Sequence, residues 1–231
     1  DVSLLYQGYL DGFAKRGGQL RTNVEIGEII STSTGWCLKT RDGEFEGTVL
    51  VNAAGAWADQ VANAARVDPI GLESFRRTAF TFTAAAPSEL HALWPMFNDA
   101  EETFYCKPYG EGFFASPAEA VSEPPGDAQA KRVDVDETIR RIQEAVALPV
   151  GEVTRYWAGL RTFSPDKAPV VGVDPKVPSF FWLVGQGGYG IKTAPALARI
   201  ASELLQTGKW PSLASDHGLT ERELGPTRFR D

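Results

Sequence analysis

Histidine and cysteine are scarce in this chain, and their scarcity limits the chemistry that it can carry. Two histidines, His91 and His217, and two cysteines, Cys37 and Cys106, occur among 231 residues. No two of them stand at a spacing typical of zinc ligands, and nothing indicates a Ser-His-Asp hydrolase. We therefore expect neither a metal site nor a hydrolytic triad. The cysteines lie far apart in strand-like segments, which favours buried free thiols over a disulfide and suits a reducing compartment, the cytoplasm.

Basic clusters and long apolar runs are also absent. The formal net charge is −7, and no group of lysines and arginines interrupts the acidic balance, which argues against binding to nucleic acid. No apolar run approaches the ~20 residues that a membrane-spanning helix needs, and the first residues lack the basic region of a signal peptide. The chain begins at Asp1 and its single methionine is Met96, so we expect a processed or truncated piece.

Enough apolar residues remain for a sizeable core, because 43% of the chain is hydrophobic. The first 68 residues combine helices with strands. Hydrophobic spacing and turn residues predict, in order, an amphipathic helix over 4–16, a strand over 22–30, a hairpin of strands 35–40 and 44–51 around Asp42-Gly43, and a helix over 58–65. The small residues after Val49-Leu-Val51 allow the close approach of a cofactor or of another backbone.

The middle of the chain has a different texture. Strand-like pieces over 77–83, 102–107 and 112–116, separated by proline and glycine turns, predict an antiparallel sheet. A polar loop then leads to Asp134 and Glu137, which form a capping-box-like pair. They predict a helix that covers one side of the sheet, with an inner face of Val135, Ile139, Ile142 and Val146.

A glycine-rich loop near the C-terminus satisfies the Gly-x-Gly-x-x-Gly spacing with Gly185, Gly187 and Gly190. It lies between an expected strand over 180–184 and a helix over 191–206, whose apolar face comprises Ile191, Ala194, Leu197, Ala198, Ala201, Leu204 and Leu205. A dinucleotide fold needs a further strand after that helix, and only a polar tail follows, which we expect to be loosely ordered. Backbone N–H groups at the helix N-terminus could still bind an electron-rich group, although a turn that only packs the helix on its strand fits equally well.

Four segments together carry a resemblance to a known family. They are Val49-Leu-Val-Asn-Ala-Ala-Gly-Ala-Trp57, Phe104-Tyr105 with Pro108 and Gly112, Trp157-Ala-Gly-Leu-Arg-Thr-Phe-Ser-Pro-Asp166, and Val184-Gly-Gln-Gly-Gly-Tyr-Gly190 with Ala194-Pro195. The chain resembles the C-terminal two-thirds of an FAD-dependent oxidoreductase of the D-amino-acid oxidase and glycine oxidase family. Members begin with a strand and a Gly-x-Gly-x-x-Gly turn for the FAD pyrophosphate, and nothing before Val49 has that pattern. We therefore expect this piece to bind FAD weakly, if at all, by itself.

The resemblance implies a mixed α/β (α+β) fold with two kinds of domain. Residues 1–68 and 155–231 would form part of a glutathione-reductase-like FAD-binding domain, and residues 69–154 an antiparallel-sheet substrate domain. FAD would be held without a covalent bond, because some relatives attach it through a late cysteine and no cysteine follows Cys106 here.

Site residues also follow from the resemblance. Arg161 would clamp the substrate carboxylate, and Tyr105 would orient the substrate. The alternatives are a structural interaction of Arg161 with Asp166 or with a helix end, and core packing for Tyr105. Cofactor-binding candidates are Val24, Ala53, Ala54, Gly55 and Trp57 toward the adenosine end, and Gly187, Gly188, Tyr189, Gly190 and Ile191 toward the isoalloxazine edge. Trp57 and Trp157 are also expected to serve in packing.

The implied reaction is the oxidation of an amino acid or secondary amine that carries a carboxylate. A hydride leaves the carbon that bears the amine for flavin N5, and water hydrolyses the resulting imine. Neither histidine is expected to act as a base. Three alternatives stay open: a 2-hydroxy-acid dehydrogenase, a glycerol-phosphate dehydrogenase, and a truncated, non-catalytic chain that is completed by a partner. The chain could also form a homo-oligomer.

Overall fold

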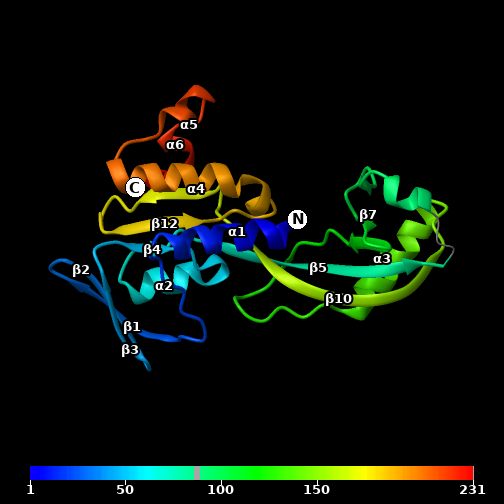
Figure 1. Cartoon of the computed structure of the whole chain (residues 1–231), viewed down its shortest axis with the longest axis horizontal. Coiled ribbons are helices and arrows are strands. Elements are labelled where there is room, and N and C mark those ends of the chain that lie inside the picture. The colour runs from blue at the N-terminus through cyan, green and yellow to red at the C-terminus, as the bar shows by residue number, and fades with distance from the viewer. Residues whose placement is uncertain (86–88, 231) are drawn as a thin grey trace. The chain divides into compact units, whose positions relative to one another are not determined.

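The computed structural model describes residues 1–85 and 89–230 of the chain (Figure 1). The chain divides into two compact units: unit 1 comprises Asp1–Gly71 and Ser164–Asp231, and unit 2 comprises Leu72–Phe163. Each unit combines helices with at least one antiparallel sheet, which confirms the mixed α/β fold class. The segment 155–163 belongs to unit 2, where it completes a long strand. The roles of the two units as cofactor and substrate domains stay a prediction.

Unit 1 contains two three-stranded sheets and most of the helices. One sheet has the order β1-β2-β3 and the other the order β11-β12-β4. Its elements are α1 (Val2–Lys15), β1 (Ile26–Thr32), β2 (Gly35–Thr40), β3 (Gly43–Gly47), β4 (Leu50–Asn52), η1 (Gly55–Trp57), α2 (Ala58–Ala64), β11 (Val170–Val173), β12 (Phe180–Val184), α4 (Gly190–Thr207), α5 (Ser212–Asp216), α6 (Glu221–Leu224) and η3 (Pro226–Phe229).

Helix α4 packs on one face of the β11-β12-β4 sheet (Figure 1). Alternate residues of β12 point to opposite faces, so Phe181 joins the cluster under α4, whereas Trp182 and its neighbour Phe180 face the other way. Phe180 contacts Trp36 of β2, whose indole Nε1 donates to the Ser179 carbonyl at 2.8 Å. These contacts join the two sheets of unit 1.

Three predictions for the helices and strands of unit 1 need correction. The strand expected over 44–51 is two strands, because the chain bends at Thr48: β3 pairs with β2, and β4 pairs in parallel with β12. The helix at the N-terminus is confirmed, but none of its residues is buried, and Leu4 and Phe13 are exposed. Likewise, on α4 the expected apolar residues Ile191 and Leu205 are exposed, while Ile200 is in the core.

The polar tail is ordered, contrary to expectation. Arg230 donates to the buried Asp174 carboxylate at 2.9 Å and to the carbonyls of Asp68 and Pro69. Burial alone would raise the pKa of Asp174, but the hydrogen bonds from Arg230, Trp182 and a backbone N–H lower it below its ordinary value. The tail is therefore fixed to the sheet both by charged hydrogen bonds and by the apolar contacts of Ala214 and Leu224 in the core cluster under α4.

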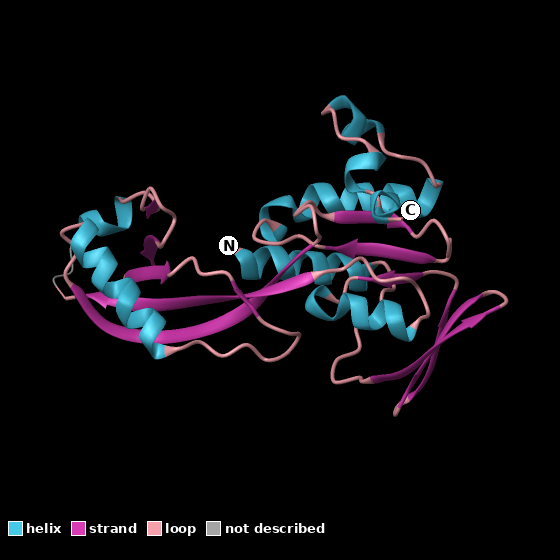
Figure 2. Cartoon of the chain, turned by 180° about the vertical axis from the view of Figure 1, so that it is seen from behind, coloured by secondary structure: helices cyan, strands magenta, loops and turns pink. Residues whose placement is uncertain are grey.

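Unit 2 is built on one large antiparallel sheet. The main path has the order β10-β5-β8-β7-β6, and β9 pairs with β5 beside it. The long strands β5 and β10 form its backbone, and a single long helix, α3, lies against them (Figure 2). The elements are β5 (Glu73–Ala84), η2 (Glu89–Leu93), β6 (Phe97–Asn98), β7 (Tyr105–Tyr109), β8 (Gly112–Ser116), β9 (Val121–Ser122), α3 (Arg132–Ala145) and β10 (Val150–Phe163).

The sheet of unit 2 has two unlike faces. The face under α3, which we name the covered face, holds the core of the unit. The opposite face, the open face, carries half-buried and exposed side chains because neighbouring residues on each strand alternate between the faces. Covered-face residues include Arg76, Phe80, Phe82, Cys106, Phe113 and Ala115, and open-face residues include Phe75, Arg77, Tyr105, Phe114, Arg155, Trp157, Gly159 and Arg161.

Helix α3 confirms the predicted inner face but not the predicted cap. Val135 and Ile142 are fully buried, and Ile139 and Val146 pack against the same core. The helix begins at Arg132, so Asp134 lies inside its first turn and forms no capping box with Glu137. Asp134 instead accepts a hydrogen bond from Arg76 at 3.0 Å.

Candidate functional site

Two groups of predicted cofactor-binding residues meet at one edge of unit 1. Strands β4 and β12 are parallel, with Asn52 opposite Trp182. Parallel strands end at the same edge of a sheet, so the turn with Ala53, Ala54 and Gly55 and the loop with Gly187 to Ile191 both leave from that edge. Ligands of open α/β sheets bind at the carboxyl ends of their strands. The structure therefore brings together two segments that lie far apart in the sequence.

The turn after β4 is held by Asn52, a residue that sequence reasoning did not single out. Its buried side chain donates to the Ala58 carbonyl at 2.8 Å and accepts from the Ala54 N–H at 3.3 Å. Gly55 has a φ of +56°, and a Cβ there would meet nothing within 4 Å. Asn52 thus fixes the shape of a small-residue turn with open space beside it. Its position directly after Val49-Leu-Val51 was the available sequence signal.

The loop after β12 leads directly into α4. Gly185 and Gly187 adopt left-handed conformations, with φ values of +73° and +53°, which favour glycine. A Cβ on Gly190 would lie 3.3 Å from the Gln186 Cβ. No side chain caps the helix, and its first turn carries no acidic residue. Its first backbone N–H groups therefore remain available to an electron-rich ring edge, which fits the expected cofactor.

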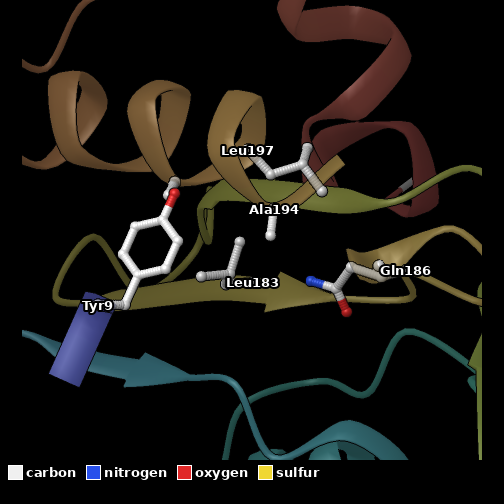
Figure 3. Close-up of a pocket in the computed structure, with 7 residues that line it drawn as sticks. Tyr9, Leu183, Gln186, Ala194 and Leu197 are labelled. Carbon is white, nitrogen blue, oxygen red and sulfur yellow. The ribbon is translucent and has the colours of Figure 1, made fainter. Parts of the chain in front are cut away.

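A cavity of about 380 Å³ borders this loop. Figure 3 shows Leu183 of β12 at its floor between Tyr9 of α1 and Ala194 of α4, with Gln186 beside it. The lining contains no charged side chain, so its polar groups are the Tyr9 hydroxyl, the Gln186 amide and the backbone at Gly190. Its lining residues are Tyr9, Leu183, Gln186, Gly190, Ala194, Leu197 and Ala198.

Two other cofactor candidates lie elsewhere in unit 1. Val24 precedes strand β1. This strand belongs to the β1-β2-β3 sheet, whereas β4 belongs to the other sheet of unit 1. Trp57 ends η1 and is 46% exposed, so any packing role that it has lies outside the core. A role of either residue in binding the cofactor stays a prediction.

Both predicted catalytic residues lie on the open face of unit 2. Arg161 is on β10, half-buried, and forms no ion pair among the described residues. Asp166, the alternative partner of Arg161, pairs with Arg228 at 2.7 Å within unit 1. The hydrogen bond from Arg228 lowers the pKa of Asp166 to about 2. Arg161 is therefore left with a charge that no described carboxylate neutralises.

Tyr105 contributes an aromatic surface to the same face. Its ring stacks on Phe114 with centroids 6.1 Å apart, and Phe114 contacts Trp157 at 5.8 Å. Trp157 therefore packs as expected, but on the open face. The neighbouring residue Phe104, not Tyr105, lies in the core.

Arg77, also on the open face, interacts electrostatically with both predicted catalytic residues. It lies opposite Gly159 in the pairing of β5 with β10, two residues from Arg161 along the strand pair. Burial lowers the pKa of Arg77, and the positive charge of Arg161 lowers it further, while Tyr105 and Glu119 act in the opposite direction. Sequence reasoning missed Arg77. The available signal was the Arg76-Arg77 pair, because consecutive strand residues face opposite sides and only one can face the core.

The cysteines, the arrangement of potential metal ligands and the polarity of the helices bear on function as well. Cys37 and Cys106 are free and buried, as predicted, and burial raises the pKa of Cys106 to about 12. Within 1–85 and 89–230, no cluster of histidine, cysteine, aspartate or glutamate is placed to hold a metal ion. The helices of the described part of the chain are too short or too polar to cross a membrane.

In unit 1, the parallel strands β4 and β12 lead into small-residue turns at the edge where open α/β sheets bind ligands. The family model described as FAD dependent oxidoreductase matches residues 1–204. The chain belongs to this family of flavin-dependent oxidoreductases, which confirms the resemblance.

Individual relatives agree with this assignment. Human dimethylglycine dehydrogenase, a mitochondrial protein, is 25% identical over 218 residues, which are 87% of this chain and 25% of that protein. L-proline dehydrogenase from P. horikoshii has the same fold, with a TM-score of 0.73, 21% identity and coverage of 94% of this chain and 56% of its own. Glycine oxidase from Geobacillus kaustophilus also has this fold, with a TM-score of 0.68, 22% identity and coverage of 84% of this chain and 50% of its own. The chain thus spans about half of these solved structures and a quarter of the human relative.

Proposed function

We propose that the protein carrying this chain oxidises amines that bear a carboxylate, amino acids or secondary amines, with non-covalently bound FAD. Family membership supports the cofactor. The observation that carries the substrate class is Arg161, which lies half-buried on the open face without an ion-pair partner in the described chain. A guanidinium presents a planar fork of donors that matches a carboxylate.

Unit 1 supplies the residues that would hold the cofactor. The backbone N–H groups at the start of α4, with Gly187 and Gly188 before them, would face the electron-rich edge of its ring system. Ala53, Ala54 and Gly55 would lie against the adenosine part, because small side chains allow close backbone approach. When bound, FAD would accept the hydride that leaves the carbon bearing the amine.

Unit 2 supplies the residues that would orient the substrate. Arg161 would bind the carboxylate, and the Tyr105 hydroxyl would donate to or accept from the substrate beside it. Neither histidine lies on the open face: His91 packs against Trp94 and Phe113, and the His217 ring lies against the Leu213 carbonyl in unit 1. Orientation of the substrate, rather than proton transfer by a histidine, is therefore the contribution we assign to this chain.

The test compares two arginines of one strand in the protein loaded with FAD. N,N-dimethylglycine and L-proline, suggested by the names of two relatives, are the first substrates, and 2-hydroxy acids and glycerol phosphate are the alternatives. Arg161→Ala should raise KM for the amines by about tenfold to a hundredfold, the value of a charge-assisted hydrogen bond. Arg155→Ala, which removes an exposed charge beside Trp157, should leave KM unchanged.

Flavin reduction followed at its visible absorption band under anaerobic conditions gives a second readout. Reduction by the carboxylate-bearing amines, but not by the corresponding amines without a carboxylate, supports the proposal. Reduction by the hydroxy acids alone, or an unchanged KM in Arg161→Ala, would sink it.

A further inference from the structure

The two consecutive arginines of β5 have opposite surroundings. Arg76, on the covered face, is within 4 Å of three carboxylates, those of Glu119, Glu123 and Asp134. Arg77, on the open face, forms no hydrogen bond or ion pair with the described residues, and its Nε is buried without a partner. A buried donor without a partner costs free energy, so this arginine requires an explanation.

Glu119 is a carboxylate near Arg77, but it is engaged elsewhere. Its Oε1 accepts a hydrogen bond from the Thr78 N–H at 2.6 Å and lies 3.7 Å from Arg76. Its Oε2 is buried and, like Arg77 Nε, has no hydrogen-bond partner. Because both atoms are unpaired, Glu119 and Arg77 do not satisfy each other.

Open space lies on the sheet beside Arg77. Gly159 is directly opposite it on β10, and a Cβ on Gly159 would meet no heavy atom within 4 Å. Arg161 follows two residues later on the same face, and such diagonal positions of an antiparallel pair lie about 7–8 Å apart. A small ligand could therefore lie over Gly159 with an arginine on each side.

We propose that Arg77 and Arg161 form a two-arginine site over Gly159, and that the substrate it selects carries two carboxylates, one for each guanidinium. This inference rests on the proposed function, because it takes Arg161 as the clamp for the first carboxylate. Arg77 is then the specificity-determining residue that distinguishes dicarboxylates from monocarboxylates.

The positive charges of Arg77 and Arg161 favour a ligand with two carboxylates over a ligand with one. The two guanidiniums repel each other on one face, and Arg161 contributes to the lowered pKa of Arg77, after burial. A monocarboxylate would neutralise one cation and leave the other half-buried and unpaired. A dicarboxylate would neutralise both, and each carboxylate could accept two hydrogen bonds from its guanidinium.

The experiment measures binding directly, with the whole FAD-loaded protein that carries this chain. Succinate serves as the dicarboxylate and propionate as the monocarboxylate, each titrated calorimetrically at low salt. We expect succinate to bind at least about tenfold more tightly than propionate. Arg77→Gln should abolish this preference, so that the two acids bind within about twofold of each other.

Two further variants keep the result interpretable. Arg155→Gln removes one positive charge from the same face, on the strand of Arg161, and it should leave the succinate preference intact if the site is specific. Gly159→Leu keeps both arginines but fills the space between them, and it should weaken binding of both acids. Circular dichroism confirms that each variant is folded.

The outcomes separate this inference from the proposed function. If propionate binds through Arg161 and Arg77→Gln changes nothing, the dicarboxylate inference is wrong while the carboxylate clamp stands. If Arg155→Gln weakens binding as much as Arg77→Gln, the binding is unspecific attraction and the inference is again wrong. Arg161→Ala is titrated in the same way, and if it binds both acids as tightly as the unmodified protein, the proposed function loses its support as well.

Discussion

Arg76 and Arg77 are the same residue type, adjacent in one strand, and the molecule treats them in opposite ways. Arg76 is 3% exposed and surrounded by carboxylates on the covered face. Arg77 is half-buried on the open face and unpaired among the described residues. The alternation of side chains along a strand places one arginine in the core and the other outside it.

The difference separates charges that hold the fold from charges that are available to a ligand. A buried charge persists only where opposite charges and hydrogen bonds compensate it, as they do for Arg76. An arginine without that compensation contributes little to folding. Its charge can instead be satisfied by an anion that binds from solvent.

The largest effect should come from breaking the covered-face cluster. Arg76→Gln leaves Glu119, Glu123 and Asp134 without their shared cation, so we expect a loss of about 3–5 kcal/mol in the free energy of unfolding. Arg77→Gln should change it by less than about 1 kcal/mol, since no ion pair is lost. Urea unfolding of the two variants measures both values. Equal losses would erase the distinction between the two arginines.

Two adjacent phenylalanines sharpen the comparison without charges. Phe113 is buried on the covered face, where it stacks on Phe82, whereas Phe114 lies half-buried on the open face beside Tyr105. Phe113→Ala should cost about 3–5 kcal/mol, and Phe114→Ala clearly less. Thermal and urea unfolding of both variants measure the two losses in the free energy of unfolding. A larger loss for Phe114→Ala would mean that the faces are misassigned.

Cys106 makes the covered face sensitive to high pH. Its folded thiol has a pKa of about 12 because it is buried, against 9.0 without that burial, so between these values the folded state holds a proton that the unfolded state loses. The contribution of the protonated thiol to the free energy of unfolding should therefore be fully present below pH 9. Above pH 9, the free energy of unfolding should fall by up to about 1.4 kcal/mol per pH unit. Unfolding at increasing pH, compared with Cys106→Ala in a Cys37→Ser background, isolates this slope. If the free energy of unfolding depended on pH in the same way with and without Cys106, the burial of the thiol would be contradicted.

The smallest effect on stability is expected at Tyr105. Its hydroxyl faces the open side of the sheet, so Tyr105→Phe should change the free energy of unfolding by less than about 0.5 kcal/mol. In the FAD-loaded protein the same change should lower kcat/KM several-fold, because a hydrogen bond to the substrate is lost. A stability loss larger than the kinetic effect would assign Tyr105 to packing instead.

Much of the fold could be predicted from local patterns. Strands over 112–116 and 180–184 and helix 191–206 follow from apolar runs bounded by glycine, and the structure has them within a residue or two. Segment 44–51 divides between two sheets because β4 pairs with β12, a partner distant in sequence. Strand β10 went unpredicted, because its charged and glycine residues are stabilised by pairing with β5.

The site shows the same limit. Arg161 and Tyr105 could be proposed from a resemblance, and the glycine loop from its spacing. Asn52 and Arg77 were missed, because their sequence signals are weak and their importance lies in what surrounds them: two hydrogen bonds in one case and missing partners in the other. Burial and pairing are tertiary properties, and a single sequence does not display them.

The central claim is that Arg76 serves the fold and Arg77 serves a ligand, and urea unfolding with and without succinate tests it most directly. A ligand that binds only the folded state stabilises it, by about 2.7 kcal/mol at a concentration one hundred times Kd. We predict that succinate stabilises the unmodified chain, loses most of this effect in Arg77→Gln, and still stabilises the weakened Arg76→Gln. Equal stabilisation of the unmodified chain and Arg77→Gln would contradict the account.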